Sequence, residues 1–195
     1  MELSEKYGEY IFLLREKLDD YRFDHSIAVA KRAVELANLY GADTEKAYVA
    51  GLLHDIQKNL SREEQLQFLN SSAIMLTDVE KVSPKVWHAI SGAEYISSKL
   101  KIEDTDIINA VRYHTTGRAG MSLLERIVYI ADFTSLDRKY PDVEVLRDIV
   151  KRDLDAGLVY ALRHTIISLS KETKPIHEDT LCAYNELIGS REWKF

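Results

Sequence analysis

Residues 50–56 of the chain read Ala-Gly-Leu-Leu-His-Asp-Ile, which places His54 and Asp55 side by side in an otherwise apolar stretch. An apolar run of this kind predicts a buried helix, so both polar side chains are expected to point from one helix into the interior. Burying an unpaired carboxylate beside an imidazole among leucines costs several kcal/mol unless a cation compensates it. The stretch therefore predicts a pair of metal ligands inside a helical protein.

Four other residues fall on, or at the end of, different apolar-periodic segments. They are His25, His88, His114 and Asp132. A helical bundle builds a site in its core by projecting such side chains inward from several facing helices. The pattern predicts that these segments meet around the His54–Asp55 pair.

The composition indicates one globular domain, residues 1–195. The chain has 195 residues, of which 46% are hydrophobic and 30% charged, and neither linkers nor internal repeats divide it. The net charge of −6 disfavours a nucleic-acid partner, although a local basic cluster could still bind a small anion. No run approaches the roughly 18 apolar residues of a membrane span, which predicts a cytoplasmic protein without a membrane partner. Cys182, the single cysteine, excludes internal disulfides and a cysteine-based metal site, and is expected to be a small buried residue.

Apolar spacing of about 3.6 residues predicts an all-α multi-helix bundle of roughly ten helices. Expected helix boundaries include Asp43 as an N-cap, Gly41 as a C-cap and capping boxes at residues 61–64 and 122–125. Residues 71–82 are expected to be irregular, and residues 116–121 to form a loop directly after His114. The predicted helices cover a first helix through residues 11–18, then about 20–40, 43–58, a short helix from 61, 84–100, 104–115, 122–133, 142–152, 153–171 and 178–189.

The expected metal ligands are His25, His54, Asp55 and Asp132. Two imidazoles and two carboxylates suit divalent Fe, Mn, Co or Zn, and the type of ligand does not choose among them. Four protein ligands on an octahedral ion leave two positions open, and such an ion lowers the pKa of bound water and so supplies hydroxide near neutral pH.

Arg22 and Lys58 indicate a phosphate substrate. Arg22 lies three positions before His25, and Lys58 lies four after His54, so each is expected to share a helix face with a ligand. A cation beside such a metal stabilises the charge that develops as a P–O bond breaks.

Four further polar residues carry weaker expectations. His88 and His114 could bind a second metal, contact phosphate as imidazolium, or simply pack. Contact with phosphate or with a metal-ligating residue is favoured. His164 and Asp148 are expected to be ordinary hydrogen-bonded core residues.

Five segments together resemble the HD superfamily of metal-dependent phosphohydrolases, and more closely its YqeK group. The superfamily resemblance rests on the order of the polar residues along the chain: a histidine, the His-Asp pair, two further histidines and a late aspartate. The segments at 113–122 and 174–177 are more specific to the YqeK group. The segments are YRFDHSIAVA (21–30), GLLHDIQK (51–58), YHTTGRAGMS (113–122), IADF (130–133) and KPIH (174–177).

The resemblance implies a helical bundle that hydrolyses diadenosine tetraphosphate symmetrically to two ADP, with iron as the resident metal and as a homodimer. The residues expected around metal and substrate match family positions in two sets. The metal ligands would be His25, His54, Asp55 and Asp132. The substrate contacts would be Arg22, His25, Lys58, His88, His114, Thr115 and Arg138 around the phosphates, and Pro175, Ile176 and His177 in a tail that closes over the nucleotide.

Two segments depart from the family wording. Residues 132–138 read DFTSLDR, where Glu-Pro-Asn or a close variant is expected before the arginine, so the contact made by residues 134–137 is open while Arg138 keeps its place. Residues 87–92 keep the histidine and glycine but vary between them.

The resulting hypothesis makes Asp55, Lys58 and His114 the catalytic residues. The metal delivers hydroxide in line to one of the two central phosphorus atoms, the cations neutralise the leaving diphosphate, and His114 or His88 positions substrate or shuttles a proton. Two alternatives remain. The same core could serve a nucleotide phosphomonoesterase or phosphodiesterase, or the chain could be a metal-dependent nucleotide sensor.

Overall fold

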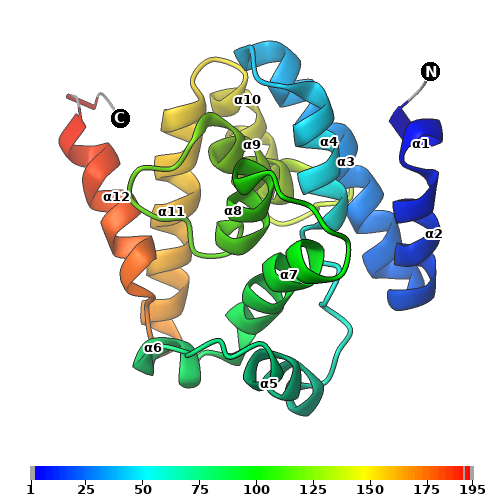
Figure 1. Ribbon diagram of the computed structural model, residues 1–195. Helices are drawn as coiled ribbons and strands as arrows, with labels where there is room; N and C mark the ends of the chain where they lie inside the picture. Colours follow the sequence, from blue (N-terminus) through cyan, green and yellow to red (C-terminus); the bar gives the residue numbers. More distant parts are fainter. Residues whose placement is uncertain (1–2, 191, 194–195) are drawn as a thin grey trace.

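The computed structural model describes residues 3–190 and 192–193, and within them the protein is helical, as the sequence predicts. Figure 1 shows the arrangement of these helices. They are α1 (Leu3–Lys6), α2 (Gly8–Lys17), α3 (Asp20–Tyr40), α4 (Thr44–Leu53), α5 (Arg62–Ser71), α6 (Asp78–Lys81), the 3₁₀ turn η1 (Pro84–Val86), α7 (Trp87–Ser98), α8 (Thr105–Tyr113), α9 (Leu123–Thr134), α10 (Val143–Val150), α11 (Leu154–Lys171) and α12 (Glu178–Ser190).

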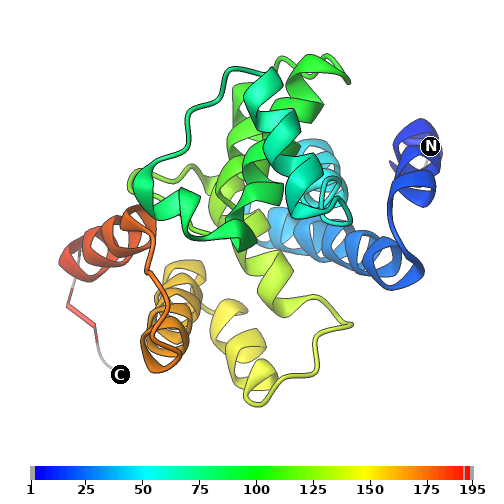
Figure 2. The same ribbon diagram turned by 90° about the horizontal axis from the view of Figure 1, so that it is seen from below.

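Helix α9 is the centre of the bundle. It packs against α3, α4, α8, α10 and α11, and the views of Figures 1 and 2 agree that α3 and α11 lie on different sides of it. Its residues Ile127–Ala131 are all buried, as expected for a helix that is apolar on every face. Asp132 follows this buried run directly, so the last turn of α9 brings a carboxylate into the interior.

Gly51 allows α4 to approach α3 closely. A Cβ atom at Gly51 would lie only 3.0 Å from the Cα atom of Ala30 and 3.2 Å from the Cβ atom of Ala33. Every residue of α4 from Ala47 to Leu53 is buried. This close packing holds the end of α4, and therefore His54, next to α3.

The predicted helix signals are present at their expected positions. Asp43 accepts hydrogen bonds from the backbone N–H groups of Glu45 and Lys46, and both predicted capping boxes are formed, at 61–64 and at 122–125. Gly41 ends α3 in the left-handed conformation with φ of 74°. Local side-chain chemistry therefore sets these boundaries.

Four features differ from the prediction. The helix expected over 43–58 ends at Leu53, and residues 54–59 form successive turns in which Ile56 N–H donates to the Leu53 carbonyl and Lys58 N–H to that of Asp55. Ile56 and Gln57 are buried in these turns, so the apolar spacing cannot distinguish them from a helix. Residues 71–82 were expected to be irregular but contain α6, opened by a capping box of Thr77 and Glu80. The 84–100 helix begins as η1 and ends at Ser98, and α1 was not predicted.

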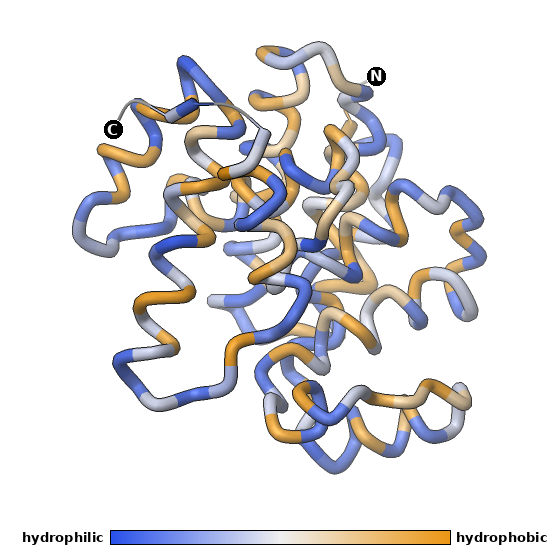
Figure 3. The backbone as a smooth tube through the Cα atoms, turned by 90° about the vertical axis from the view of Figure 1, so that its left-hand side faces the viewer, coloured by the Kyte–Doolittle hydropathy of each residue, from blue (hydrophilic) through white to orange (hydrophobic). Residues whose placement is uncertain are grey.

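The core is one large apolar cluster with a small satellite, in which Leu69, Trp87 and Ile90 join α5 to α7. Figure 3 shows hydrophobic and hydrophilic residues alternating along the outer helices, as expected when one face of each is buried. Three burial predictions are wrong, because Cys182, His164 and Asp148 are exposed. Among the described residues, no helix combines the length and apolarity needed to cross a membrane.

Candidate metal centre

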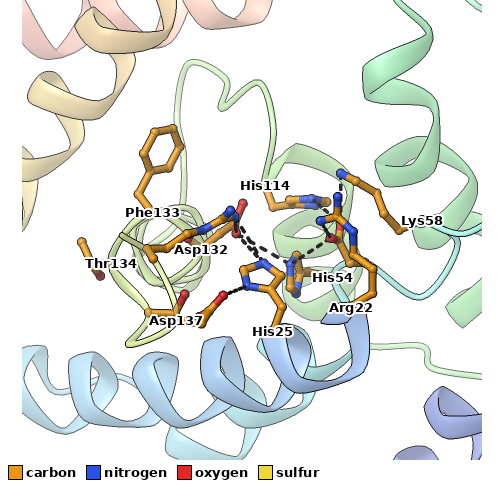
Figure 4. Close-up of polar contacts among 12 residues, drawn as sticks. Arg22, His25, His54, Lys58, His114, Asp132, Phe133, Thr134 and Asp137 are labelled. Atoms are coloured by element: carbon orange, nitrogen blue, oxygen red, sulfur yellow. Dashed lines mark hydrogen bonds and ion pairs between the residues drawn. The ribbon is translucent and has the colours of Figure 1, made fainter. Parts of the chain in front are cut away.

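Six histidines and aspartates from five parts of the chain meet in the interior (Figure 4 labels four of them). The cluster takes His25 from α3, the pair after α4, one histidine from α7, one directly after α8, and an aspartate from α9. Its members are His25, His54, Asp55, His88, His114 and Asp132. The first five are buried, and the Asp132 side chain is 16% exposed. The fold therefore brings together every metal ligand expected from the sequence, although their role as ligands remains a proposal.

Two histidine rings are oriented by hydrogen bonds from Nδ1 to backbone carbonyls. His54 Nδ1 lies 2.7 Å from the Gly51 carbonyl oxygen, and His114 Nδ1 lies 2.8 Å from that of Val111. A carbonyl only accepts, so each Nδ1 donates. In a neutral ring this leaves the lone pair on Nε2, and this atom faces the cluster.

The atoms around His54 Nε2 fit a metal ion. This nitrogen is buried, has no hydrogen-bond partner, and lies 3.7 Å from Asp55 Oδ2 and 3.9 Å from Asp132 Oδ1. The ligand atoms of His25, His54 and Asp55 all lie within 4.8 Å of one another. An unpartnered buried nitrogen beside two carboxylate oxygens is the donor set that a divalent transition metal prefers.

The other oxygen of Asp55 faces a second histidine pair. Asp55 Oδ1 is 3.2 Å from His88 Nε2 and 3.5 Å from His114 Nε2, and the two histidine nitrogens are 3.2 Å apart. The two carboxylate oxygens of Asp55 therefore face different histidine nitrogens, Oδ2 that of His54 and Oδ1 those of this pair. The expectation that His88 and His114 lie at the site is met in position, and the geometry permits a second metal.

The pKa shifts of His54, His88, Asp55 and Asp132 suit metal binding, whereas at His25 burial is outweighed by the hydrogen bond and charge of Asp132, which raise the pKa of the ring. Burial lowers the pKa of His54 to about 3 and that of His88 to about 4, so both rings are neutral near pH 7. Burial alone would raise the pKa of Asp55, but the neighbouring His54, His114 and His88 outweigh it and hold that pKa well below its usual value. Burial is likewise outweighed at Asp132, where the His25 hydrogen bond and the Arg138 charge lower the pKa. Neutral imidazoles beside ionised carboxylates are the forms that bind metals.

Three cationic side chains contact the two carboxylates. Arg22 Nη1 is 3.3 Å from Asp55 Oδ2, and Lys58 Nζ is 3.4 Å from Asp55 Oδ1. Arg138 Nη2 contacts Asp132 Oδ1, while its Nε donates to the Asp132 backbone carbonyl at 2.7 Å. All three residues were expected here. The helix-face argument for Lys58 is wrong, however, because the turns at 54–59 and not a continued helix bring it to Asp55.

Comparison with known proteins identifies the family. A model of the HD domain matches residues 22–137, which include every residue of the buried cluster. The chain belongs to the HD domain family.

Relatives of this HD-domain protein share most of its length. A protein of Halalkalibacterium halodurans named "Bis(5'-nucleosyl)-tetraphosphatase, symmetrical" is 38% identical over 93% of this chain and 96% of its own. A Bacillus subtilis protein of the same name is 34% identical over 93% of this chain and 97% of its own. The crystal structure of a predicted HD superfamily hydrolase involved in NAD metabolism, from Clostridium acetobutylicum, has a TM-score of 0.92 and 34% identity over 95% of this chain and 98% of that chain.

Asp137 is a part of the HD-domain site that sequence reasoning missed. Its Oδ2 accepts a hydrogen bond of 2.7 Å from His25 Nδ1, which turns His25 Nε2 toward Asp132 Oδ1 at 2.9 Å (Figure 4). Asp137 lies in the segment that departs from the family wording, where its contact was left open. The structure supplies that contact: a carboxylate that orients a candidate metal ligand.

The HD-domain protein also has a cavity of about 440 Å³, called here the large cavity. Its lining includes Thr115, which directly follows His114 in the sequence, and Pro175 and His177 of the predicted tail, whereas Ile176 is not among its lining residues. Four cationic residues also line it: Arg62, Lys81, Lys85 and Lys174. Two of these cations pair with neighbouring carboxylates, Lys81 with Asp78 and Lys174 with Glu172.

Proposed function

We propose that this HD-domain protein hydrolyses diadenosine tetraphosphate symmetrically, adding one water to give two molecules of ADP. The observation that carries the proposal is the convergence of four imidazoles, two carboxylates and three cations at one buried centre. The names of the Halalkalibacterium halodurans and Bacillus subtilis relatives support this substrate and this symmetry.

His25, His54, Asp55 and Asp132 would hold a divalent transition metal, with iron as our first choice and Mn, Co or Zn as alternatives. Such an ion polarises a phosphoryl oxygen and makes hydroxide available near neutral pH. The lone pair of His54 Nε2 and its distances to the carboxylates support this assignment. Asp55, His88 and His114 could hold a second ion.

The cations act on the phosphates. Arg22, Lys58 and Arg138 already lie within contact of Asp55 or Asp132, so phosphate oxygens bound at this centre would meet positive charge from three directions. Cations placed where negative charge develops stabilise the transition state of phosphoryl transfer. Burial lowers the pKa of Lys58, which makes its proton easier to donate to the leaving diphosphate.

His114 and His88 are placed to position substrate or to transfer a proton. His88 Nε2 is 2.9 Å from Lys58 Nζ and 3.2 Å from His114 Nε2, so the three side chains form a chain of polar contacts from the lysine to the second histidine. Such a chain can carry a proton to the leaving oxygen or hold a phosphate oxygen in place.

The large cavity would take a nucleoside. Thr115 provides a buried hydroxyl without a hydrogen-bond partner, and Pro175 and His177 also line the cavity. Ile176, which does not line the cavity, would serve as packing for this tail. A homodimer remains a prediction of the family resemblance, and a cytoplasmic location a prediction from the sequence.

The decisive experiment is chromatographic product analysis with diadenosine tetraphosphate in the presence of Fe(II), Mn(II), Co(II) or a chelator. ADP as the sole product, lost with chelator, is expected. AMP plus ATP would mean attack at an outer phosphorus. Turnover only of nucleotide monoesters or diesters would favour the phosphohydrolase alternatives, and tight nucleotide binding without turnover would favour the sensor.

Asp55→Ala is the matching variant, and Asp148→Ala is its control. Asp148 is an exposed aspartate that pairs with Lys151 at the surface, so its loss leaves the centre unchanged. Asp55→Ala should abolish turnover while the far-UV circular dichroism spectrum remains helical. Full turnover by a metal-loaded Asp55→Ala protein would contradict the assignment.

A further inference from the structure

A second, smaller cavity lies beside the candidate metal centre. It has a volume of about 310 Å³ and is lined by Asp132, Phe133, Arg138, Tyr140 and His164. It shares no lining residue with the large cavity. The two are neighbours across α11, because His164 lines the small cavity and the next residue, Thr165, lines the large one.

Three rings form the wall of the small cavity, and their neighbours hold them in place. The Tyr140 hydroxyl donates to the Phe133 carbonyl at 2.8 Å, and the Tyr140 ring lies 6.0 Å from the His164 ring with a tilt of 33°. The Phe133 ring stacks on the buried Tyr129 ring at 5.3 Å and points away from the histidine cluster (Figure 4). A wall of fixed rings offers a stacking surface for a planar base.

Arg138 stands at the boundary between this cavity and the centre. It lines the cavity, and its Nη2 atom also contacts Asp132 Oδ1 and lies 3.3 Å from His25 Nε2. A ligand that extends from the centre into the cavity would therefore contact the Arg138 guanidinium first and the aromatic rings next. Phosphate followed by a purine is the order of groups in a nucleotide, and the cavity volume falls at the lower end of small-molecule sites.

We propose that the small cavity is a second nucleoside subsite, which binds the adenine base of one half of the dinucleotide while the large cavity binds the other half. This inference rests on the proposed function. A dinucleotide cut at its middle carries a nucleoside on each side of the reacting phosphorus, so a centre that cuts there must accommodate two. Thr115, which directly follows the candidate ligand His114, lines the large cavity, and the candidate ligand Asp132 lines the small one. Each cavity therefore includes a residue from a different ligand-bearing segment.

His164 is the wall residue best suited to a test, because it is exposed and can be replaced without opening the core. His164→Ala should raise the KM for diadenosine tetraphosphate about fivefold or more, the effect expected from loss of one base-stacking contact, with kcat nearly unchanged. His164→Phe, which keeps a ring, should stay close to the unmodified protein. Ile167→Ala is the matched control, since Ile167 is exposed on the same helix and lines neither cavity.

Binding of ADP to the Mn(II)-loaded proteins, measured by calorimetry, separates this inference from the proposed function. Weaker ADP binding by His164→Ala than by the Ile167→Ala control would support the subsite even if no turnover occurred. If the unmodified protein fails to hydrolyse the dinucleotide, the proposed function fails, and the calorimetry still decides the subsite. An unchanged KM together with unchanged ADP binding in His164→Ala would overturn it, as would a loss confined to kcat.

Discussion

At the scale of single residues, Asp137 shows how a side chain outside the ligand set can control a ligand. Asp137→Ala removes the acceptor of the His25 Nδ1 hydrogen bond and frees the ring to turn. We expect Mn(II) affinity to fall about 10- to 100-fold, the usual effect of losing such a partner, and Asp137→Asn to lose less because its amide oxygen still accepts. Competition with a chelating dye measures the affinity. Equal affinity for the alanine variant and the unmodified protein would show that His25 does not need this contact or is not a ligand.

Asp137 also shows which part of the site could not be predicted from the sequence. His54 and Asp55 could be predicted because adjacent residues share one apolar context, and the other ligands because each lies on an apolar-periodic segment. Asp137 meets His25 across 112 positions of the chain, a pairing that only the packing of α3 against α9 determines. Lys58 was predicted at the site through a helix that ends before reaching it, so its position was right and the reason wrong.

At the scale of elements, a residue in the left-handed conformation follows the last turn of α3, α5 and α11. Only the residue after α3 is a glycine. Gly41 ends α3 with φ of 74°, whereas Ala73 and Thr173 occupy the same kind of position after α5 and α11 with φ of 55° and 53°. We expect Gly41→Ala to lower the free energy of unfolding by about 1 kcal/mol, because no atom crowds the added Cβ and the left-handed backbone alone opposes it. Urea denaturation measures the change.

Gly8→Ala is the matched control for that variant. Gly8 also has no atom within 4 Å of an added Cβ, but its φ is not positive, so alanine should leave the stability of the protein unchanged or slightly higher. An equal loss in the two variants would show that the left-handed conformation is not the cause.

The ionised carboxylate of Glu80, in the short helix α6, makes a contribution to stability that depends on pH. Burial would raise the pKa of its carboxyl, but the hydrogen bond from the Thr77 backbone N–H and the Arg112 charge outweigh it, so the folded pKa lies below the usual 4.5. A depressed folded pKa contributes stability above the unfolded pKa, and this contribution is lost as the pH falls through the folded value.

Glu80→Gln should therefore destabilise the protein by about 1.5–3 kcal/mol at pH 7, the range for hydrogen bonds to a charged group, and by less as the pH falls below about 4.5. Urea denaturation of both proteins between pH 7 and pH 3.5 tests this. A stability difference that stays constant over that range would exclude the titration of Glu80 as its origin.

Element boundaries could be predicted where side chains cap the backbone. The capping boxes at 61–64 and 122–125 and the Asp43 cap are local, and the structure contains all three. The box of Thr77 and Glu80 was overlooked because α6 has only one turn and contains a single buried residue, Glu80, so no apolar periodicity accompanies it. The end of α4 escaped prediction because buried turns and a buried helix carry the same apolar pattern.

At the scale of the whole molecule, the candidate ligands tie together helices that are distant along the chain. His25 belongs to α3, Asp55 follows α4 and Asp132 belongs to α9, so an ion bound by all three stabilises the folded protein and has no equivalent site in the unfolded chain. The central position of α9 explains why this coupling should extend to the whole bundle, since five other helices pack against it.

Mn(II) at about 100 times its Kd should therefore stabilise the protein by about 2.7 kcal/mol, which raises the melting temperature by roughly 5–10 °C for a chain of this size. Differential scanning calorimetry with Mn(II) and with a chelator measures the shift. Asp132→Asn, which keeps the shape of the side chain and removes its charge, should lose most of it, while Asp148→Asn, at the exposed surface, should keep it. Mg(II) should give a smaller shift, because imidazole ligands suit transition metals better than Mg(II). Equal melting temperatures with Mn(II) and with chelator would show that the buried cluster is held by its own charges and does not depend on a bound ion.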